Sequence, residues 1–357
     1  MRPRKSTANR IARPAGHRRP ASLPDVTLDT SSTGDVGEVA LPYAVTLPVL
    51  GIPTRFASDD RAMLEIVDEA FGVWRALGER EPADAGDPVD VRIVVSGARD
   101  ETPELRAAPI QHSMSDQLRF VAWSEAGVAT SDPARRLAVV HASAALVADR
   151  ARFRTDMLEA VVLALLSCYD RHPVHAAAVA HRGNALLLAA PSGTGKSTLA
   201  YACHADGMDL LGDDHVRVQL EPLVRVWGWP ARVRLLAETA ARMAAPHTPA
   251  HDLDPKRKAV VDAREGMRAS RLVADDATIC VLSRDGGPVA LEPLAPAAVA
   301  RALEEQLAPG FDRFPARWPS VVRALSDRGG WRLNLSHDAR EAVPVVRDLL
   351  RRRAGRD

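Results

Sequence analysis

The sequence predicts an α/β fold, in which a mixed sheet covered by helices follows a smaller α+β region. The first observation is that short apolar runs of strand length alternate with segments of helical periodicity over residues 171–357. The second is that one buried-strand pattern, residues 186–190, runs directly into a loop of small residues and then into a helix. The third is composition. A chain of 357 residues with 46% hydrophobic and 26% charged residues is typical of a soluble globular protein of one large or two ordinary domains.

The chain divides into three predicted parts: a tail at 1–40, an α+β domain at 41–170 and a main domain at 171–357. The tail is predicted to be disordered, because its first twenty residues hold seven Arg or Lys residues and no acidic residue. We interpret it as a solvated tail. The alternative is a basic arm that contacts an acidic peptide or nucleic acid.

Periodicity predicts the elements of the α+β domain. The clearest helix is 59–77, which places six apolar residues on one face: Met63, Ile66, Val67, Ala70, Phe71 and Trp74. Strands are expected at 44–50, 89–95, 118–124, 127–130 and 136–140. A long apolar helix at 153–169 leads into the main domain.

The same patterns predict the elements of the main domain. Strands are expected at 174–180, 185–190, 210–219, 223–226, 278–282, 289–291 and 331–335, and helices from 196 to near 207 and at 296–307, 318–327 and 339–353. Residues 181–184 predict a hairpin turn between the first two strands, and Asp285-Gly286-Gly287 predicts another between 278–282 and 289–291.

The loop after residues 185–190 has the pattern of a phosphate-binding P-loop. Its order of strand, Gly-rich turn and helix start lets backbone N–H groups wrap a phosphate at the positive end of the helix dipole. Lys196 would neutralise the β- and γ-phosphate oxygens, and the Ser197 hydroxyl would bind Mg²⁺. The predicted nucleotide-binding residues here are Ser192, Gly193, Thr194, Gly195, Lys196, Ser197 and Thr198. The consensus begins with Gly where this chain has Ala190, a change of one methyl group. The sequence therefore predicts ATP and Mg²⁺ as cofactors.

An acidic pair follows the P-loop helix, in the segment Gly212-Asp213-Asp214-His215. Neighbours on a regular strand point to opposite faces, so Gly212 predicts that the strand ends or bends before the pair. We expect Asp213 to act as base toward an acceptor hydroxyl and Asp214 to bind the metal with Ser197. The reverse assignment stays open. His175, predicted on the strand before the loop, is a further catalytic candidate.

These residues resemble a known family. His175-Ala-Ala-Ala-Val, the loop Pro-Ser-Gly-Thr-Gly-Lys-Ser-Thr and Gly212-Asp213-Asp214-His215-Val216 are similar to the catalytic domain of HPr kinase/phosphorylase. They are more similar to HPr-kinase-related proteins outside sugar regulation, which include precursor-peptide kinases of lasso peptide pathways. The resemblance covers residues 160–350 and is specific in 175–235.

The resemblance implies roles for particular residues. Lys196 and Ser197 would hold phosphate and Mg²⁺, one Asp of the pair would be the base, and His175 would lie near the γ-phosphate. Two departures argue against HPr as substrate and against a reverse phosphorylase reaction. The family's metal-associated Glu before the glycine at Gly228 is missing, and the basic loop lacks the sugar-regulation signature.

Two lysines outside the loop are further candidates for phosphate contact. The chain has only four lysines, and outside the tail they are Lys196, Lys256 and Lys258. Arginine replaces lysine easily on a solvated surface but not where a compact ammonium is needed. Lys256 and Lys258 also fall where the family keeps its basic loop. The alternative is a solvated surface position.

The expected function is that of a cytoplasmic ATP-dependent kinase acting on a hydroxyl, of serine, in a peptide or small protein. A lasso-type ribosomal peptide pathway is the nearest analogy. The net charge of +1 gives no reason to expect nucleic acid, and no apolar run has the length of a membrane span. A homo-oligomer is left open. Alternatives are a small-molecule kinase on the same scaffold and a nucleotide-binding regulatory module without turnover.

Overall fold

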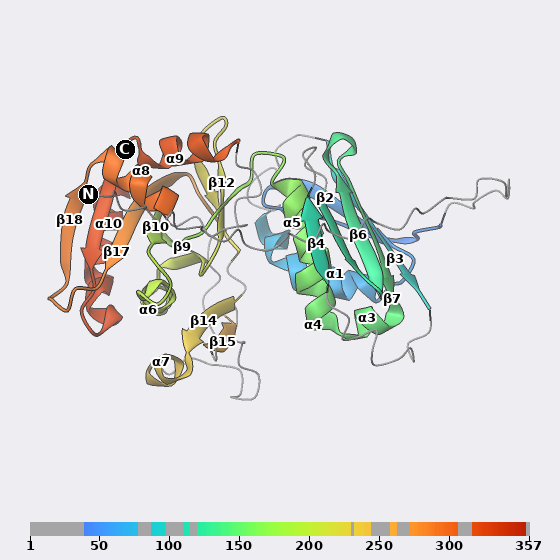
Figure 1. Cartoon of the computed structure of the whole chain (residues 1–357), viewed down its shortest axis with the longest axis horizontal. Coiled ribbons are helices and arrows are strands. Elements are labelled where there is room, and N and C mark those ends of the chain that lie inside the picture. Colours follow the sequence, from blue (N-terminus) through green and yellow to red (C-terminus); the bar gives the residue numbers. More distant parts are fainter. Residues whose placement is uncertain are drawn as a thin grey trace, which may run out of the picture. The chain divides into compact units, whose positions relative to one another are not determined.

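A computed structural model describes residues 39–77, 87–97, 110–114, 120–229, 232–243, 258–262, 272–305 and 316–354 (Figure 1). Residues 39–357 belong to one compact unit, and residues 1–38 of the predicted tail lie outside the described residues. The described elements form several sheets with helices packed on them, so the predicted mixed α/β fold is confirmed. No described helix is long and apolar enough to cross a membrane.

The first sheet has seven strands in the order β1-β2-β3-β7-β6-β5-β4. Its strands are β1 (Tyr43–Val49), β2 (Ile52–Ser58), β3 (Val89–Ser96), β4 (Gln111–Met114), β5 (Phe120–Ser124), β6 (Gly127–Asp132) and β7 (Leu137–Ser143). β2, β3 and β7 run parallel, and the other neighbours pair antiparallel. The predicted strands of 41–170 are all present, and the sequence patterns missed β2 and β4.

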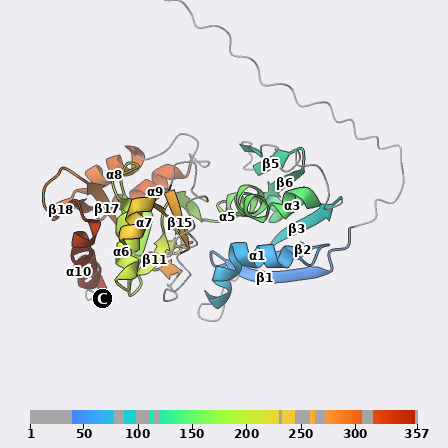
Figure 2. The same cartoon turned by 90° about the horizontal axis from the view of Figure 1, so that it is seen from below.

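Helices cover one face of this sheet (Figure 2). They are α1 (Met63–Phe71), the 3₁₀ helix η1 (Gly72–Leu77), α3 (Ala144–Ala148), α4 (Arg150–Arg152), the π-helix η3 (Phe153–Glu159) and α5 (Ala160–Leu166), with a short 3₁₀ turn η2 (Pro133–Arg135) before β7. Phe56 of β2 stacks on Phe71 at 5.0 Å between ring centroids. The other face is charged, since Arg55 and Arg92 both pair with Asp90 across β2 and β3.

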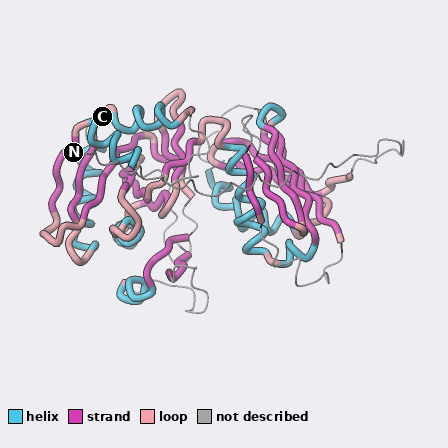
Figure 3. The backbone as a smooth tube through the Cα atoms, in the orientation of Figure 1, coloured by secondary structure: helices cyan, strands magenta, loops and turns pink. Residues whose placement is uncertain are grey.

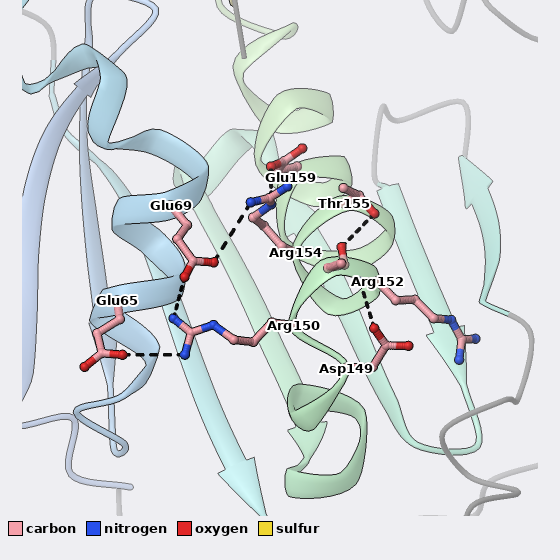
Figure 4. Close-up of polar contacts among 9 residues, drawn as sticks. Glu65, Glu69, Asp149, Arg150, Arg152, Arg154, Thr155 and Glu159 are labelled. Atoms are coloured by element: carbon pink, nitrogen blue, oxygen red, sulfur yellow. Dashed lines mark hydrogen bonds and ion pairs between the residues drawn. The ribbon is translucent and has the colours of Figure 1, made fainter. Parts of the chain in front are cut away.

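Ion pairs connect α1 to the helices after β7 (Figure 4). Arg150 donates to Glu69 at 2.7 Å and to Glu65 at 3.5 Å, and these bonds raise the pKa of Arg150. Arg154 lies 3.2 Å from Glu159 and 4.0 Å from Glu69. The two arginines therefore join segments about 85 residues apart along the chain, at a partly exposed site where each pair adds little stability.

The two helices predicted for this region are shorter in the structure than the ranges that their apolar periodicity indicates. The helix expected at 59–77 begins at Met63, because the Asp60 carboxylate accepts the Ala62 N–H at 2.9 Å in a turn that precedes it. The helix expected at 153–169 is π-helical over Phe153–Glu159 and ends at Leu166. Neither difference changes which face is buried.

The second sheet has six strands in the order β11-β9-β10-β17-β19-β18. Its strands are β9 (Ala177–His181), β10 (Asn184–Ala189), β11 (Asp209–Gly212), β17 (Asp276–Ser283), β18 (Ala290–Leu294) and β19 (Gly330–Asn334). α6 (Lys196–Ala205), the 3₁₀ turn η5 (Ala339–Ala342) and α10 (Val343–Ala354) share one hydrophobic cluster with it. α8 (Pro296–Glu305) and α9 (Trp318–Ser326) share a second hydrophobic cluster with the strand residues that point to the opposite face. The sheet is therefore covered by helices on both faces (Figure 1).

One of the two predicted hairpins is confirmed and the other is wrong. β9 and β10 pair antiparallel around Arg182 and Gly183, which both have positive φ as a type I′ turn requires. The hairpin expected at 285–287 does not form, because β19 lies between β17 and β18. The Asp285 turn is instead bonded to β19, where Asn334 donates to the Asp285 carboxylate at 2.6 Å.

Two predicted strands are each split between two sheets. A four-stranded sheet, ordered β16-β13-β12-β8, contains β8 (His172–Val174), β12 (Val216–Gln219), β13 (Arg225–Trp227) and β16 (Val273–Ala274). The strand expected at 174–180 breaks at residues 175–176, and the one expected at 210–219 breaks at 213–215. The chain turns sharply after Gly212, where a Cβ would lie 2.5 Å from the His215 carbonyl oxygen. His175 is therefore in a break and not on a strand as predicted.

A small hairpin lies beside α6 (Figure 3). It consists of β14 (Arg232–Leu236) and β15 (Lys258–Asp262), and α7 (Ala237–Arg242) follows β14 directly. Its buried residues Val233, Leu235, Ala259 and Val261 belong to the cluster that contains α6. Cys168, Cys203 and Cys280 are free thiols, and burial raises the pKa of Cys203 and of Cys280 to about 12.

Candidate active site

The topology of the six-stranded sheet brings the predicted site residues to one edge. β10 and β11 both pair antiparallel with β9, and β17 is parallel to β10, so three strands end at the same edge. Loop 190–195 follows β10, and Asp213 and Asp214 follow β11. His175 comes just before β9, whose opposite direction places its amino end at that edge too. Ligands of open α/β sheets bind at the carboxyl ends of strands, so this edge is the candidate active site.

Two glycines of the loop between β10 and α6 have a backbone conformation that favours residues without a side chain. Gly193 and Gly195 have φ of +89° and +115°, a region that residues with a Cβ rarely adopt. Ala190, which replaces the consensus glycine, is not among the described residues with positive φ. The substitution therefore causes no backbone strain at this position. Ser192 and Gly193 are exposed at the tip, and the Thr194 hydroxyl donates to the Pro191 carbonyl at 3.0 Å.

Lys196 folds back onto this loop. Its ammonium donates to the Ala190 carbonyl at 2.5 Å and to the Pro191 carbonyl at 3.4 Å, and only 7% of the residue is exposed. Lys196, Ser197 and Thr198 form the first turn of α6, where N–H groups have no partner within the helix. The cationic side chain and the N–H groups of the helix start therefore lie at the same loop, as an anion site requires.

Asp213 and Asp214 have different surroundings. Asp213 is 6% exposed, and its carboxylate accepts the backbone N–H of Arg234 in β14 at 2.8 Å. The Asp214 side chain is 43% exposed. The bend after Gly212 thus turns one carboxylate inward, toward the β14–β15 hairpin, and leaves the other accessible from solvent.

Two histidines flank Asp214. His175 Nε2 lies 3.6 Å from one carboxylate oxygen, and His215 Nδ1 lies 3.5 Å from the other. The two rings meet edge to face, with centroids 5.5 Å apart. The sequence named His175 and Asp214 together as site residues, and the structure brings them together. His215 joins them although it is not among the predicted site residues.

Burial lowers the pKa of His215 to about 4. Asp214 opposes this shift, and the positive charges of Arg217 and Arg234 and the proximity of His175 add to it. His215 is therefore neutral at physiological pH, and its ring offers Asp214 a neutral neighbour.

The oxygen donors at this edge fit Mg²⁺ bound together with a nucleotide. Within the described ranges no group of three or more His, Cys, Asp or Glu side chains could hold a metal ion. Mg²⁺ in phosphate-transfer sites is bound by one or two carboxylates or hydroxyls together with substrate phosphates, and needs no such group. The Ser197 hydroxyl and the Asp pair are donors of this kind.

Two predicted residues, Lys256 and Lys258, are not brought to the site by the described structure. Lys256 lies outside the described residues. The backbone of Lys258 pairs with Leu236 in the β14–β15 hairpin, and its side chain lies outside the described part. Their predicted contact with phosphate stays a prediction. Trp227 and Trp229 are packing residues, since Trp227 is 3% exposed and Trp229 contacts the ring of Phe71 at 5.9 Å between centroids.

The sequence patterns missed one cation at this edge. Arg284 follows β17, and a Cβ built on Gly195 would lie 3.3 Å from its guanidinium nitrogen. Its side chain is exposed beside the loop. The signal that would have found it is its place after a strand parallel to β10. The sequence analysis missed it because it placed a hairpin turn at 285–287, directly after Arg284, and so paired the preceding strand with 289–291.

Comparison with known proteins adds a structural likeness. No family model matches the chain, and no curated protein matches it. A solved structure that it resembles is that of the Hpr(Ser) kinase/phosphatase from Coxiella burnetii, with a TM-score of 0.30 and 11% identity over 52% of this chain and 96% of that chain. A likeness of this size carries no argument about function, so the functional proposal below rests on the site residues.

Proposed function

We propose that the protein is an ATP-dependent kinase that transfers the γ-phosphate to a hydroxyl, of serine, in a peptide or small protein. The observation that carries the proposal is the shared edge of the six-stranded sheet. A P-loop-type turn with Lys196 at a helix start and an accessible carboxylate, Asp214, lie at the ends of strands that share this edge. Phosphoryl transfer needs charge neutralisation and positioning more than covalent help from the protein.

The chain's own residues would act in the following way. The N–H groups of loop 190–195 and the Lys196 ammonium bind the phosphates, and Lys196 exchanges its bonds to Ala190 and Pro191 for phosphate oxygens. The acceptor hydroxyl loses its proton to a carboxylate as its oxygen bonds to the γ-phosphorus. The bond from that phosphorus to the bridging oxygen breaks, and ADP leaves with the electron pair. Mg²⁺ held by Ser197 and Asp213 would neutralise phosphate charge.

The difference in burial between the two aspartates favours Asp214 as the base. This reverses the predicted assignment, in which Asp213 is the base. A general base must come within hydrogen-bond distance of an acceptor that enters from solvent. Asp214 is accessible and lies between two imidazoles, whereas Asp213 is buried and already accepts the Arg234 N–H. Asp213 suits the inner position, where a metal and phosphates would neutralise its charge.

The peptide acceptor is supported by the sequence resemblance of residues 175–235 to precursor-peptide kinases. The exposed Arg234, on the hairpin next to Asp213, would lie beside an entering peptide. A small-molecule acceptor and a nucleotide-binding module without turnover are the other outcomes of the test below.

The test is phosphate transfer by the purified protein. With Mg·ATP and a serine-bearing peptide encoded beside its gene, the wild type should give a peptide heavier by one phosphate. Lys196→Ala should abolish this transfer while the fold persists, because the variant loses the cation that stabilises the transition state. Arg301→Ala, which alters an exposed arginine on α8, is the control and should keep wild-type transfer.

Two outcomes would overturn the proposal. A folded Lys196→Ala variant with full transfer would remove the loop from the mechanism. Tight ATP binding by the wild type, with no modified peptide, protein or small alcohol and no ATP hydrolysis, would instead identify a regulatory module.

A further inference from the structure

Arg284 lies on the opposite side of the loop strand from the acidic pair. In the sheet order β11-β9-β10-β17, the Asp pair follows β11 on one side of β10, and Arg284 follows β17 on the other. The guanidinium reaches the loop itself, since a Cβ on Gly195 would lie 3.3 Å from one of its nitrogens. Gly195 immediately precedes the first turn of α6, which would bind phosphate.

The backbone around Arg284 is held on both sides. The Leu335 N–H donates to the Ser283 carbonyl at 2.8 Å, and the Asp285 N–H donates to the Asn334 side-chain oxygen at 3.1 Å. Asn334 also donates to the Asp285 carboxylate at 2.6 Å and to the Pro288 carbonyl at 3.0 Å. The Arg284 side chain therefore extends from a fixed point at the end of β17, which lowers the entropy lost when its guanidinium binds a ligand.

The in-line geometry of phosphoryl transfer connects the position of Arg284 with the leaving oxygen. The attacking and leaving oxygens lie on opposite sides of the transferred phosphorus. If the acceptor is deprotonated on the β11 side, the leaving oxygen faces the β17 side, where Arg284 lies. Negative charge grows on that oxygen as its bond to the γ-phosphorus breaks, and a guanidinium is well suited to bind phosphate oxygens in two bonds.

We infer that Arg284 binds the β-phosphate of the nucleotide and stabilises the leaving oxygen during transfer. This rests on the proposed kinase function and adds a catalytic residue to it. Lys196 and Arg284 then contact the phosphate chain from the helix start and from the neighbouring strand end.

The test compares nucleotides that differ in their phosphates. Arg284→Ala should weaken binding of both ADP and ATP by about tenfold to a hundredfold, the usual effect of one lost bond to a charged group, and should leave AMP binding unchanged. It should also lower kcat, and Arg284→Lys should restore part of both losses, because an ammonium supplies charge without the paired donors. Arg301→Ala is the matched control and should change none of these values. Calorimetry measures the affinities, and urea unfolding checks that each variant is folded.

The outcomes separate this inference from the proposed function. If the wild type binds neither ADP nor ATP, the kinase proposal fails. If the wild type binds both and Arg284→Ala leaves both affinities and kcat within twofold, the kinase proposal stands and the role of Arg284 is wrong. An equal loss for AMP would also contradict it, because AMP has no β-phosphate.

Discussion

At the scale of single residues, the two neighbouring carboxylates have distinct expected effects. Asp214→Asn should leave ATP affinity nearly unchanged and lower transfer by about 10²–10⁴, the usual range for a lost general base. Asp213→Asn should chiefly raise the Mg²⁺ concentration needed for half-maximal rate. Asp213, the buried carboxylate that accepts the Arg234 N–H, is the one proposed to bind the metal. Steady-state rates over a Mg²⁺ series measure both effects. A base effect at Asp213 alone would restore the assignment that the sequence preferred.

Short motifs indicated the residues of the candidate site, but they did not indicate the side chains that surround those residues. Lys196, Asp213 and Asp214 are found from short segments, because a loop that binds phosphate needs particular residue types at fixed spacing. Arg284 and the partnership of His175 with His215 were not found. They depend on which strands are neighbours, and strand order is set by contacts between distant parts of the chain.

At the scale of elements, the start of the last helical segment offers a test of capping. The Asp338 carboxylate accepts the Arg340 N–H at 3.0 Å, and it pairs with the Arg340 guanidinium at 2.6 Å. Asp338→Ala should lower the free energy of unfolding by about 0.5–2 kcal/mol, the usual loss for a cap. Asp338→Asn should lose less, because an amide oxygen can still accept the N–H. Urea unfolding at neutral pH measures both, and equal losses would contradict the capping role.

The same ion pair predicts a pH dependence. The hydrogen bond from Arg340 lowers the pKa of Asp338 from 3.8 to about 2. A carboxyl whose pKa is lower in the folded state stabilises the fold fully above its unfolded pKa, and this contribution is lost as the pH falls toward the folded value. The stability difference between the wild type and Asp338→Asn should therefore be constant above pH 4 and shrink between about pH 4 and pH 2. Arg340→Ala removes the guanidinium but keeps the backbone N–H that also lowers this pKa, so its stability difference from the wild type should shrink over the same pH range by a smaller amount.

The boundaries of the strands show which features local sequence patterns do not predict. Alternation and periodicity placed most strands and helices within a few residues. They joined β8 to β9 and β11 to β12, because both members of each pair are apolar and only the bends at His175 and Gly212 separate them. The turn at Asp285 has a hairpin sequence, and its bonds to Asn334 show that such a turn can also join strands that are not neighbours.

At the scale of the whole molecule, Trp227 connects the seven-stranded sheet to the four-stranded sheet. Its strand, β13, is in the smaller sheet, while its ring belongs to the hydrophobic cluster of the larger one. Arg171 lies over the ring at 4.8 Å and donates to the Leu50 carbonyl at 2.8 Å. The β1–β2 turn at Leu50 and Gly51 thus packs directly on the indole.

This contact predicts unequal effects of one substitution at two glycines. Gly51 and Gly183 have φ of +77° and +83°, so Gly→Ala should strain both backbones alike. A Cβ on Gly51 would lie 2.3 Å from the Trp227 ring, whereas one on Gly183 meets nothing within 4 Å. Gly51→Ala should therefore lower the free energy of unfolding by about 1–3 kcal/mol more than Gly183→Ala, the usual cost of overpacking. Equal losses in urea unfolding would mean that the turn and the indole are not in contact.

The bonds of Lys196 to its own loop also determine how the protein responds to amine-reactive reagents. Acylation needs an unprotonated, accessible amine, and Lys196 is 7% exposed with its ammonium donating to two carbonyls. Only three other lysines, Lys5, Lys256 and Lys258, compete for the label in the whole chain. Mass spectrometry of peptides after brief acylation would therefore give a nearly background-free record of how often the loop releases its lysine. The labelling rate of Lys196 measures loop opening in the protein without added substrate.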